Sequence, residues 1–443
     1  MLTSLRGTLH LFSRNVRLFL LTAFLVGFGF DGGVLSVLFN LYLLRLGYGP
    51  EVVGVINSAG LFSFALFSLP AALFGNWWGL RRMILIGLGV VLLGGTLLPV
   101  AELFVGSWQQ GWLMGAYIVI LLGMAFFFVN GAPFMMASTP PAQRDHLFSM
   151  QTGLMAVAAF LGNLVGGILP AGFARLLGTT LDSPVPYRFP LLVAALLIVP
   201  ALLLMFNTKA VATDDNEEQT DDADPRMPAS AGSKPLPTGL FLLLLFVRML
   251  QVCGVATLFV FFNVYLDTHL QIATSTIGLV SAAGRLIAVP VALLTPYFTR
   301  RFGNLNVVVW SCLIVSLGYL PMTFLPTLGA AAVGYIAVVG LSAMRYPATM
   351  NFSMRIVAPS QRGILTGAGE MGAGVAFTGL ALGGGYVITR LGYESLFVLT
   401  SVLNLTGALL FWYFFRNFRR KKSERTATPV APQAAKPMEG PPV

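Results

Sequence analysis

Long apolar runs separated by short polar turns fill most of the chain. Each run holds about 20 or more mostly apolar residues, which is the length that a helix needs to cross a bilayer. Twelve runs can be counted, six on each side of a polar stretch. They lie at 16–45, 51–75, 83–104, 111–137, 148–173 and 188–206, and at 238–266, 273–298, 305–326, 328–350, 363–389 and 394–415. The pattern predicts an all-α membrane protein with 12 transmembrane helices in two six-helix bundles.

Two polar segments set the predicted domain boundaries. The first bundle covers 1–206 and the second covers 238–417. Between them, 207–237 carries seven acidic residues and then prolines and small residues, which predicts a solvated, disordered linker. A basic cluster begins at Arg416 and continues into the tail, 418–443. The tail ends in sequence that is rich in proline and alanine. We expect the tail to be disordered, with its basic start near lipid headgroups.

Composition narrows the class of protein. Hydrophobic residues make up 56% of the chain, charged residues 10%, and the mean hydropathy is +0.80. Because a soluble protein carries about a quarter charged residues, a water-soluble enzyme is nearly excluded. The net charge of +10 is therefore attributed to membrane topology, and no nucleic-acid partner is expected.

The placement of basic residues predicts the orientation. With the N-terminus inside, 20 of the 27 lysines and arginines fall on the inner side, four on the outer side and three within the spans. Cytoplasmic loops carry an excess of lysine and arginine. The bias predicts that both termini and the central linker are cytoplasmic. The compact 12-helix chain with short loops favours a prokaryotic plasma (inner) membrane.

The two halves repeat each other in sequence. The pairs that match in order and spacing are Asn40-Leu41-Tyr42-Leu43 with Asn263-Val264-Tyr265-Leu266, Gly54 with Gly278, Ala59-Gly60 with Ala283-Gly284, Gly79 with Gly303, Pro141-Ala142-Gln143-Arg144 with Pro359-Ser360-Gln361-Arg362, and Gly166-Gly167 with Gly384-Gly385. Parallel duplication of a six-helix unit is a transporter architecture that places the binding site between the halves. The repeat thus predicts two pseudo-symmetric bundles and a site at their interface.

The turn after the second apolar run carries a family resemblance. It reads Asn76-Trp77-Trp78-Gly79-Leu80-Arg81-Arg82, and the second half has Arg300-Arg301-Phe302-Gly303-Asn304. This turn, together with the repeat, resembles the major facilitator superfamily, whose signature there is roughly Asp-Arg-x-Gly-Arg-Arg. Gly79, Arg81 and Arg82 are kept, and the resemblance implies a gating role for them. Asn76 replaces the acid, so it can hydrogen-bond a helix end but cannot pair with a cation.

Glycines recur at close spacing in the fifth and eleventh helices. The fifth reads Gly162-Asn163-Leu164-Val165-Gly166-Gly167, where exporters of the family often carry Gly-Pro-x-x-Gly-Gly, and Asn163 stands in place of the proline. Small residues let helices approach closely. We expect tight packing between the halves at these glycines, and the export signature is weak.

Five charged residues lie inside the predicted spans: Asp31, Arg248, Arg285, Arg345 and Glu370. A charge within the bilayer costs from about 2.5 kcal/mol upward, so each is a functional candidate. At about 1.5 Å per residue, Asp31, Arg285 and Arg248 fall near mid-membrane, and the other two lie nearer the cytoplasmic surface.

The resembled fold lines its central cavity with the first, fourth, seventh and tenth helices, and this implies roles for the candidates. Asp31 is expected to face Arg248 across the interface and to carry a coupling proton. A salt bridge between Arg345 and Glu370 is expected, either purely structural or as an inner gate. The residues expected to bind substrate are Arg248, Gln251, Arg285 and Asn130.

Asp31 has two interpretations that sequence leaves open. It is either a buried carboxylate permanently paired with an arginine, or a coupling or substrate-binding acid. The outcome depends on whether Arg248 or Arg285 reaches it. The flanking Gly32-Gly33 would let the helix flex or a ligand approach closely.

These observations favour a secondary active transporter that works by alternating access. Proton-coupled export of a small organic molecule is the leading hypothesis. Uptake or exchange of an organic anion is the alternative transport function, because the predicted spans contain three arginines and only two acids. A non-transporting sensor or assembly protein of the same fold also remains open.

Other chemistry finds little support. No nucleophile constellation, metal-ligand spacing or phosphate-binding Gly-Lys-Ser/Thr loop is present in the sequence, so neither an enzyme nor a cofactor is expected. The expected partners are a small-molecule substrate, protons and membrane lipids, and the family resemblance implies a monomer.

Overall fold

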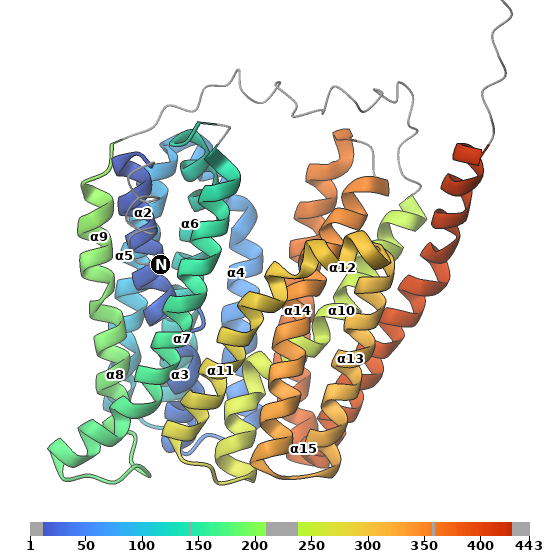
Figure 1. Ribbon diagram of the computed structural model, residues 1–443. Coiled ribbons are helices and arrows are strands. Elements are labelled where there is room, and N and C mark those ends of the chain that lie inside the picture. Colours follow the sequence, from blue (N-terminus) through green and yellow to red (C-terminus); the bar gives the residue numbers. More distant parts are fainter. Residues whose placement is uncertain (1–11, 141–142, 210–237, 357–358, 428–443) are drawn as a thin grey trace, which may run out of the picture.

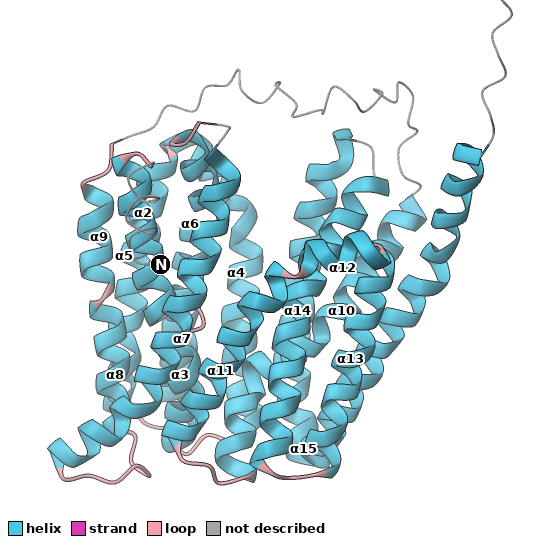
Figure 2. Ribbon diagram, in the orientation of Figure 1, coloured by secondary structure: helices cyan, strands magenta, loops and turns pink. Residues whose placement is uncertain are grey.

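The computed structural model describes residues 12–140, 143–209, 238–356 and 359–427. Within these ranges the chain is helical apart from short turns (Figure 2). The first half comprises α2 (Arg14–Gly29), α3 (Val34–Arg45), α4 (Pro50–Trp78), α5 (Leu80–Leu97), the 3-10 helix η1 (Leu98–Leu103), α6 (Ser107–Ala137), α7 (Arg144–Leu177), α8 (Val185–Leu196) and α9 (Ile198–Phe206).

The second half comprises α10 (Thr238–Val264), the π-helix η4 (Tyr265–His269), α11 (Thr274–Leu293), α12 (Thr295–Phe302), α13 (Asn304–Phe324), α14 (Leu328–Ile356) and α15 (Pro359–Ala427). Eleven segments of the described chain are long and apolar enough to span a membrane. The last of them bends at Gly392, whose φ is +83°, and so makes two crossings. This confirms the predicted all-α architecture, and the span positions agree within a few residues.

Three predicted helices differ in detail. The first is broken between Gly29 and Val34, the sixth is divided into α8 and α9, and the eighth into α11 and α12. Of the predicted linker, 207–237, only the first three positions lie within the described residues. The helix α15 continues to Ala427, past the predicted boundary at 417.

The two halves stand side by side, and the ends of the linker lie at one end of both (Figure 1). We call this end the linker side and the opposite end the far side. The start of α2 is also on the linker side, because the amide of Asn15 exchanges hydrogen bonds of 3.2 and 2.9 Å with the backbone of Lys209. The two halves diverge toward the linker side and meet toward the far side (Figure 1).

The sequence repeat reappears as a repeat of contacts. Tyr117 stacks on Phe39 with ring centroids 4.3 Å apart, and it lies where a side chain at Gly60 would stand. The second half builds the same cluster from Phe262, Tyr335 and Gly284, with stacked rings 4.1 Å apart. Each half thus packs its first, second and fourth helices around one tyrosine.

Glycines carry the contact between the halves. A Cβ on Gly167 of α7 would lie 2.9 Å from the Cα of Gly278 on α11. The repeated position, Gly385 of α15, meets the backbone of Pro50 and Glu51 on α4 in the same way. The prediction of tight packing between the halves is confirmed at Gly167 and Gly385, whereas Gly162 and Gly166 pack against the first helix of their own half.

We expect Gly167→Ala to destabilise the protein, because the new methyl group would press on the backbone of α11. Overpacking of this kind costs about 1–3 kcal/mol. Gly172→Ala, on the same helix but facing open space, is the matched control. Thermal unfolding in detergent should show a lower midpoint for the first variant alone, and equal midpoints would contradict the close contact.

Candidate functional site

The first transmembrane helix breaks at Phe30-Asp31-Gly32-Gly33. Gly32 adopts φ +78°, in the left-handed region that other residues rarely occupy. A side chain on Gly33 would collide with the carbonyl groups of Gly27 and Phe28. The glycine pair therefore does more than add flexibility: the break needs both residues.

Two polar side chains satisfy the backbone groups that the break frees. The N–H of Gly32 donates to Ser36 Oγ at 3.0 Å. Asn163 of α7 donates from Nδ2 to the carbonyl of Gly32 and also to that of Ala159. The bare backbone at Gly162 lets α7 approach this closely, because a Cβ there would strike Phe28. In a membrane such pairing is required, since no water replaces it.

The break exposes Asp31 in the middle of a 32-residue span. Arg285 of α11, in the other half, lies next to it. A Cβ on Gly32 would be 3.0 Å from the guanidinium carbon of Arg285, and Arg285 interacts electrostatically with Asp31. The expectation that Arg248 faces Asp31 is wrong: Arg285 takes that place. Opposite charges from the two halves thus lie near each other at mid-membrane, although no ion pair or hydrogen bond joins them within the described part of the chain.

Asp31 opens onto a cavity between the halves. Its walls come mainly from the first half and are mostly apolar, with Phe259 added from α10. The lining residues are Phe30, Asp31, Leu35, Ser36, Phe39, Asn40, Asn57, Tyr117, Ile120, Leu121, Met124 and Phe259. Asn57 donates to Asn40 at 2.8 Å, and Asn40 donates to the carbonyl of Val260 at 2.7 Å. These amides are already paired, so the carboxylate of Asp31 is the charged group that a bound molecule would meet.

Arg248 is engaged elsewhere. Its guanidinium binds Glu370 at 2.5 Å and donates to the carbonyl of Gly369 at 3.1 Å. Tyr346 also donates to Glu370, at 3.2 Å. The expected bridge between Arg345 and Glu370 is therefore wrong, because α14 turns Tyr346 toward Glu370 and leaves Arg345 only 7% exposed.

The two uncharged candidates are both buried. Asn130 is 1% exposed and donates to the carbonyls of Ala71 and Phe126, so it packs α6 on α4 away from the cavity. Gln251 is also 1% exposed, and neither of its amide atoms has a hydrogen-bond partner in the part of the chain that the structure describes. It lines a second cavity together with Arg248.

The turn at Gly79 makes its hydrogen bonds to other residues of the first half. Gly79 adopts φ +89°, and Gly303 repeats this with φ +83°. Arg81 donates to the carbonyl of Phe206 at 2.8 Å and to Thr208 Oγ1 at 3.1 Å, whereas Arg82 is exposed. Arg81 thus ties the second and third helices to the end of the sixth. Its gating role stays a prediction.

An ion pair that the sequence did not reveal joins the halves on the far side. Arg45, at the end of α3, binds Asp267 in η4 through two hydrogen bonds of 2.6 and 2.7 Å. The same arginine donates to the carbonyl of Leu181 at 2.8 Å. Arg45 lies two positions beyond the repeated Asn-x-Tyr-Leu segment in the first half, and Asp267 directly follows the same segment in the second half. Their shared position just after the repeat is the signal that could have located them.

Polar bonds reinforce this closure. Tyr187 and Thr274 share a hydrogen bond of 3.0 Å, and Asn263 donates to the carbonyl of Ser36 at 2.8 Å. With Asn40 and Val260 these bonds link the halves from mid-membrane to the far side. Among the described residues no group of three His, Cys, Asp or Glu could hold a metal ion.

Comparison with known proteins identifies the architecture. The sequence model of the Major Facilitator Superfamily matches residues 19–344 and 244–440. The chain belongs to this superfamily. The major facilitator fold accounts for the two halves, the repeat and the central cavity.

Individual relatives are distant. An uncharacterized MFS-type transporter, YfkF, of Bacillus subtilis (strain 168) is 26% identical over 142 residues, which is 32% of this chain and 34% of that protein. The chain therefore matches about a third of this curated relative. Among solved structures, a D-xylose-proton symporter aligns with a TM-score of 0.70 and 15% identity over 89% of this chain and 97% of the other. A bacterial homologue of the human lysosomal transporter Spinster aligns with a TM-score of 0.69 and 15% identity, over 91% of this chain and 97% of the other.

Asn163→Ala should loosen the break in the first helix. It leaves the carbonyl of Gly32 without its donor, and a buried unpaired group costs about 1–3 kcal/mol. We expect faster hydrogen exchange in the 28–36 segment. Asn207→Ala, which removes an exposed amide at the end of α9, should leave exchange there unchanged. Equal exchange in the two variants would show that Asn163 does not hold the break.

Asp267→Asn should open the far side, because Arg45 loses its counter-ion. Breaking a fully buried pair costs about 3–5 kcal/mol, and the 18% exposure of the Arg45 side chain lowers this figure. Spin labels in the 46–49 and 270–273 loops should move apart. Glu102→Gln, which breaks the ion pair with Arg188 inside the first half, is the control. An unchanged distance in Asp267→Asn would argue against a gate.

Proposed function

We propose that this chain is a proton-coupled exporter of small, largely apolar organic molecules. The observation that carries the proposal is the position of Asp31, which stands at a helix break beside Arg285 of the other half and lines an aromatic cavity. Broken helices at the interface between repeats are where transporters of this type place substrate and coupling-ion sites.

Coupling follows from the placement of the two charges on different halves. The charge of Asp31 is stabilised by the neighbouring Arg285. When the halves rock, the distance between them changes, so the affinity of Asp31 for a proton changes with conformation. Protonation in turn removes the attraction between the halves at this point. Proton binding and rocking are therefore linked, as antiport requires.

The lining of the cavity suggests the class of substrate. Phe30, Phe39, Tyr117 and Phe259 present apolar rings, and the amides of Asn40 and Asn57 are bonded to each other. A molecule with a large apolar body and one polar or charged group fits this lining. The polar group would compete with Arg285 for Asp31, or with Asp31 for Arg285.

Direction and orientation complete the proposal. With the linker and both termini in the cytoplasm of a prokaryotic cell, the far side is the outside of the plasma membrane. The structure is then an inward-facing state, closed by Arg45 and Asp267. Export is proposed because a lone deep acid in the first helix resembles the arrangement in exporters of the family.

Uptake or exchange of an organic anion is the second candidate. Its support is the charge balance of the membrane interior, where Glu370 neutralises Arg248 and Asp31 faces Arg285. Arg345 is left over as a surplus positive charge. An anionic substrate would neutralise this positive charge.

Proton flux into liposomes tests the proposal. Vesicles hold wild type or Asp31→Asn with a pH dye inside, and lipophilic cations or organic anions are added outside. Some compound should drive proton movement in wild type, and Asp31→Asn should lose at least about nine-tenths of it, because an amide cannot carry the proton. Glu394→Gln, an exposed acid in the same chain, should keep the flux.

The outcomes separate the hypotheses. Equal flux in wild type and folded Asp31→Asn would make Asp31 structural. Flux driven only by organic anions would favour the second candidate. If no compound moves protons or shifts the unfolding midpoint, the chain is a non-transporting member of the superfamily.

A further inference from the structure

Arg345 is a buried cation, and no carboxylate among the described residues is placed to neutralise it. Only three acids occur in the second bundle, Asp267, Glu370 and Glu394. Asp267 binds Arg45 and Glu370 binds Arg248. Glu394 is exposed just beyond the bend at Gly392. A charge that is buried without a partner is costly, so this arginine needs an explanation.

The groups near Arg345 do not supply a negative charge. It interacts electrostatically with the thiols of Cys253 and Cys312 and with Arg248, and only the last is an ion. Arg248 already has its own acid. The interior of the second bundle thus carries one surplus positive charge between α10, α13 and α14.

Unpaired polar atoms gather beside this charge. Thr349 stands one turn from Arg345 on the same face of α14, is 7% exposed, and its hydroxyl has no partner among the described residues. Gln251 on α10 is 1% exposed, and neither the nitrogen nor the oxygen of its amide has a hydrogen-bond partner among the described residues. Buried polar groups are almost always hydrogen-bonded, so two such side chains together indicate a site for a bound molecule.

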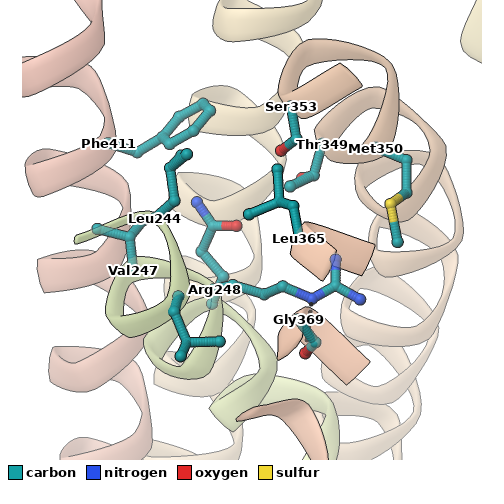
Figure 3. A pocket seen from close by; sticks show the side chains of 11 residues that line it. Leu244, Val247, Arg248, Thr349, Met350, Ser353, Leu365, Gly369 and Phe411 are labelled. Atoms are coloured by element: carbon teal, nitrogen blue, oxygen red, sulfur yellow. Dashed lines mark hydrogen bonds between the residues drawn. The ribbon is translucent and has the colours of Figure 1, made fainter. Parts of the chain in front are cut away.

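Both side chains line one small cavity. Figure 3 shows Arg248, Thr349 and Ser353 around it, with Gly369 on one side and Phe411 and Val247 on the other. The lining therefore offers an amide and hydroxyls as hydrogen-bond donors inside an apolar wall, whereas the guanidinium of Arg248 in the same wall is already paired with Glu370. Donors beside a surplus positive charge select an anion and repel a cation.

We propose that the second bundle contains an anion-binding site between α10, α14 and α15, which takes a small monovalent anion. Gln251 and Thr349 donate hydrogen bonds to the anion. Arg345 stands one turn from Thr349, behind the cavity lining, and provides the charge that the anion neutralises. The site is separate from the cavity at Asp31 and does not require that the anion be transported. A halide and a carboxylate group share the chemistry that this site recognises.

Thermal unfolding of the purified full chain at constant ionic strength tests the site. Sodium gluconate, whose anion is much larger than chloride or acetate, is replaced stepwise by sodium chloride or by sodium acetate. A ligand that binds only the folded protein raises the midpoint as its concentration rises. We expect a saturable rise in wild type, no rise in Arg345→Gln, and a several-fold higher half-saturating concentration in Thr349→Val.

Arg175→Gln is the matched control, because it removes an exposed arginine at the end of α7 and should keep the full rise. A rise at lower concentration with acetate than with chloride would assign the site to carboxylates, and the reverse order to halides. The proposal would be overturned if the unfolding midpoint of wild type changed with neither anion, or if the midpoint of Arg345→Gln rose as much as that of wild type.

A second measurement covers the case in which Arg345→Gln does not fold. Crystals of wild type soaked in bromide should show anomalous density within hydrogen-bond distance of Gln251 and Thr349. Bromide density elsewhere only would also overturn the site. Neither experiment measures transport, so failure here leaves the proton-flux hypothesis untouched.

Discussion

The hydrogen bond from Asn163 to the carbonyl of Gly32 is the constraint on which the central site depends. A helix that stops in the middle of a bilayer leaves backbone groups without partners, and each would cost several kcal/mol. Asn163 and Ser36 remove that cost, and the bare backbone of Gly162 brings α7 close enough to do so. Only because the break is satisfied can Asp31 leave the helix and face the cavity.

Duplication explains why the halves meet as they do. Asn40 reaches across to the carbonyl of Val260, and Asn263 reaches back to that of Ser36. Each asparagine also bonds to the second helix of its own half, through Asn57 or Ser281. The break itself has no counterpart, because α10 runs unbroken from Thr238 to Val264. The functional asymmetry of the protein thus lies in its first helix.

The sequence predicted much of the fold because hydrophobic length and repetition are local properties. Span positions, the two bundles and the glycine contacts at Gly167 and Gly385 all follow from it. Pairing of charges did not follow, because it depends on how each helix is rotated about its axis. Depth alone could not show that Arg285 faces Asp31 while Arg248 turns to Glu370. Asn163 was visible as a departure from the family pattern, but its partner was not.

The broken first helix also changes the electrostatics of the site through the backbone itself. One continuous helix would carry its partial charges at the two membrane surfaces. Two shorter helices place the negative end of α2, at Gly29, and the positive end of α3, at Val34, on either side of Asp31. The N-terminal end of α3 therefore presents a fixed dipole that favours negative charge at mid-membrane, and the C-terminal end of α2 presents one that opposes it. This part of the field belongs to the main chain, so it persists in every state in which the break persists, whatever side chain the other half presents.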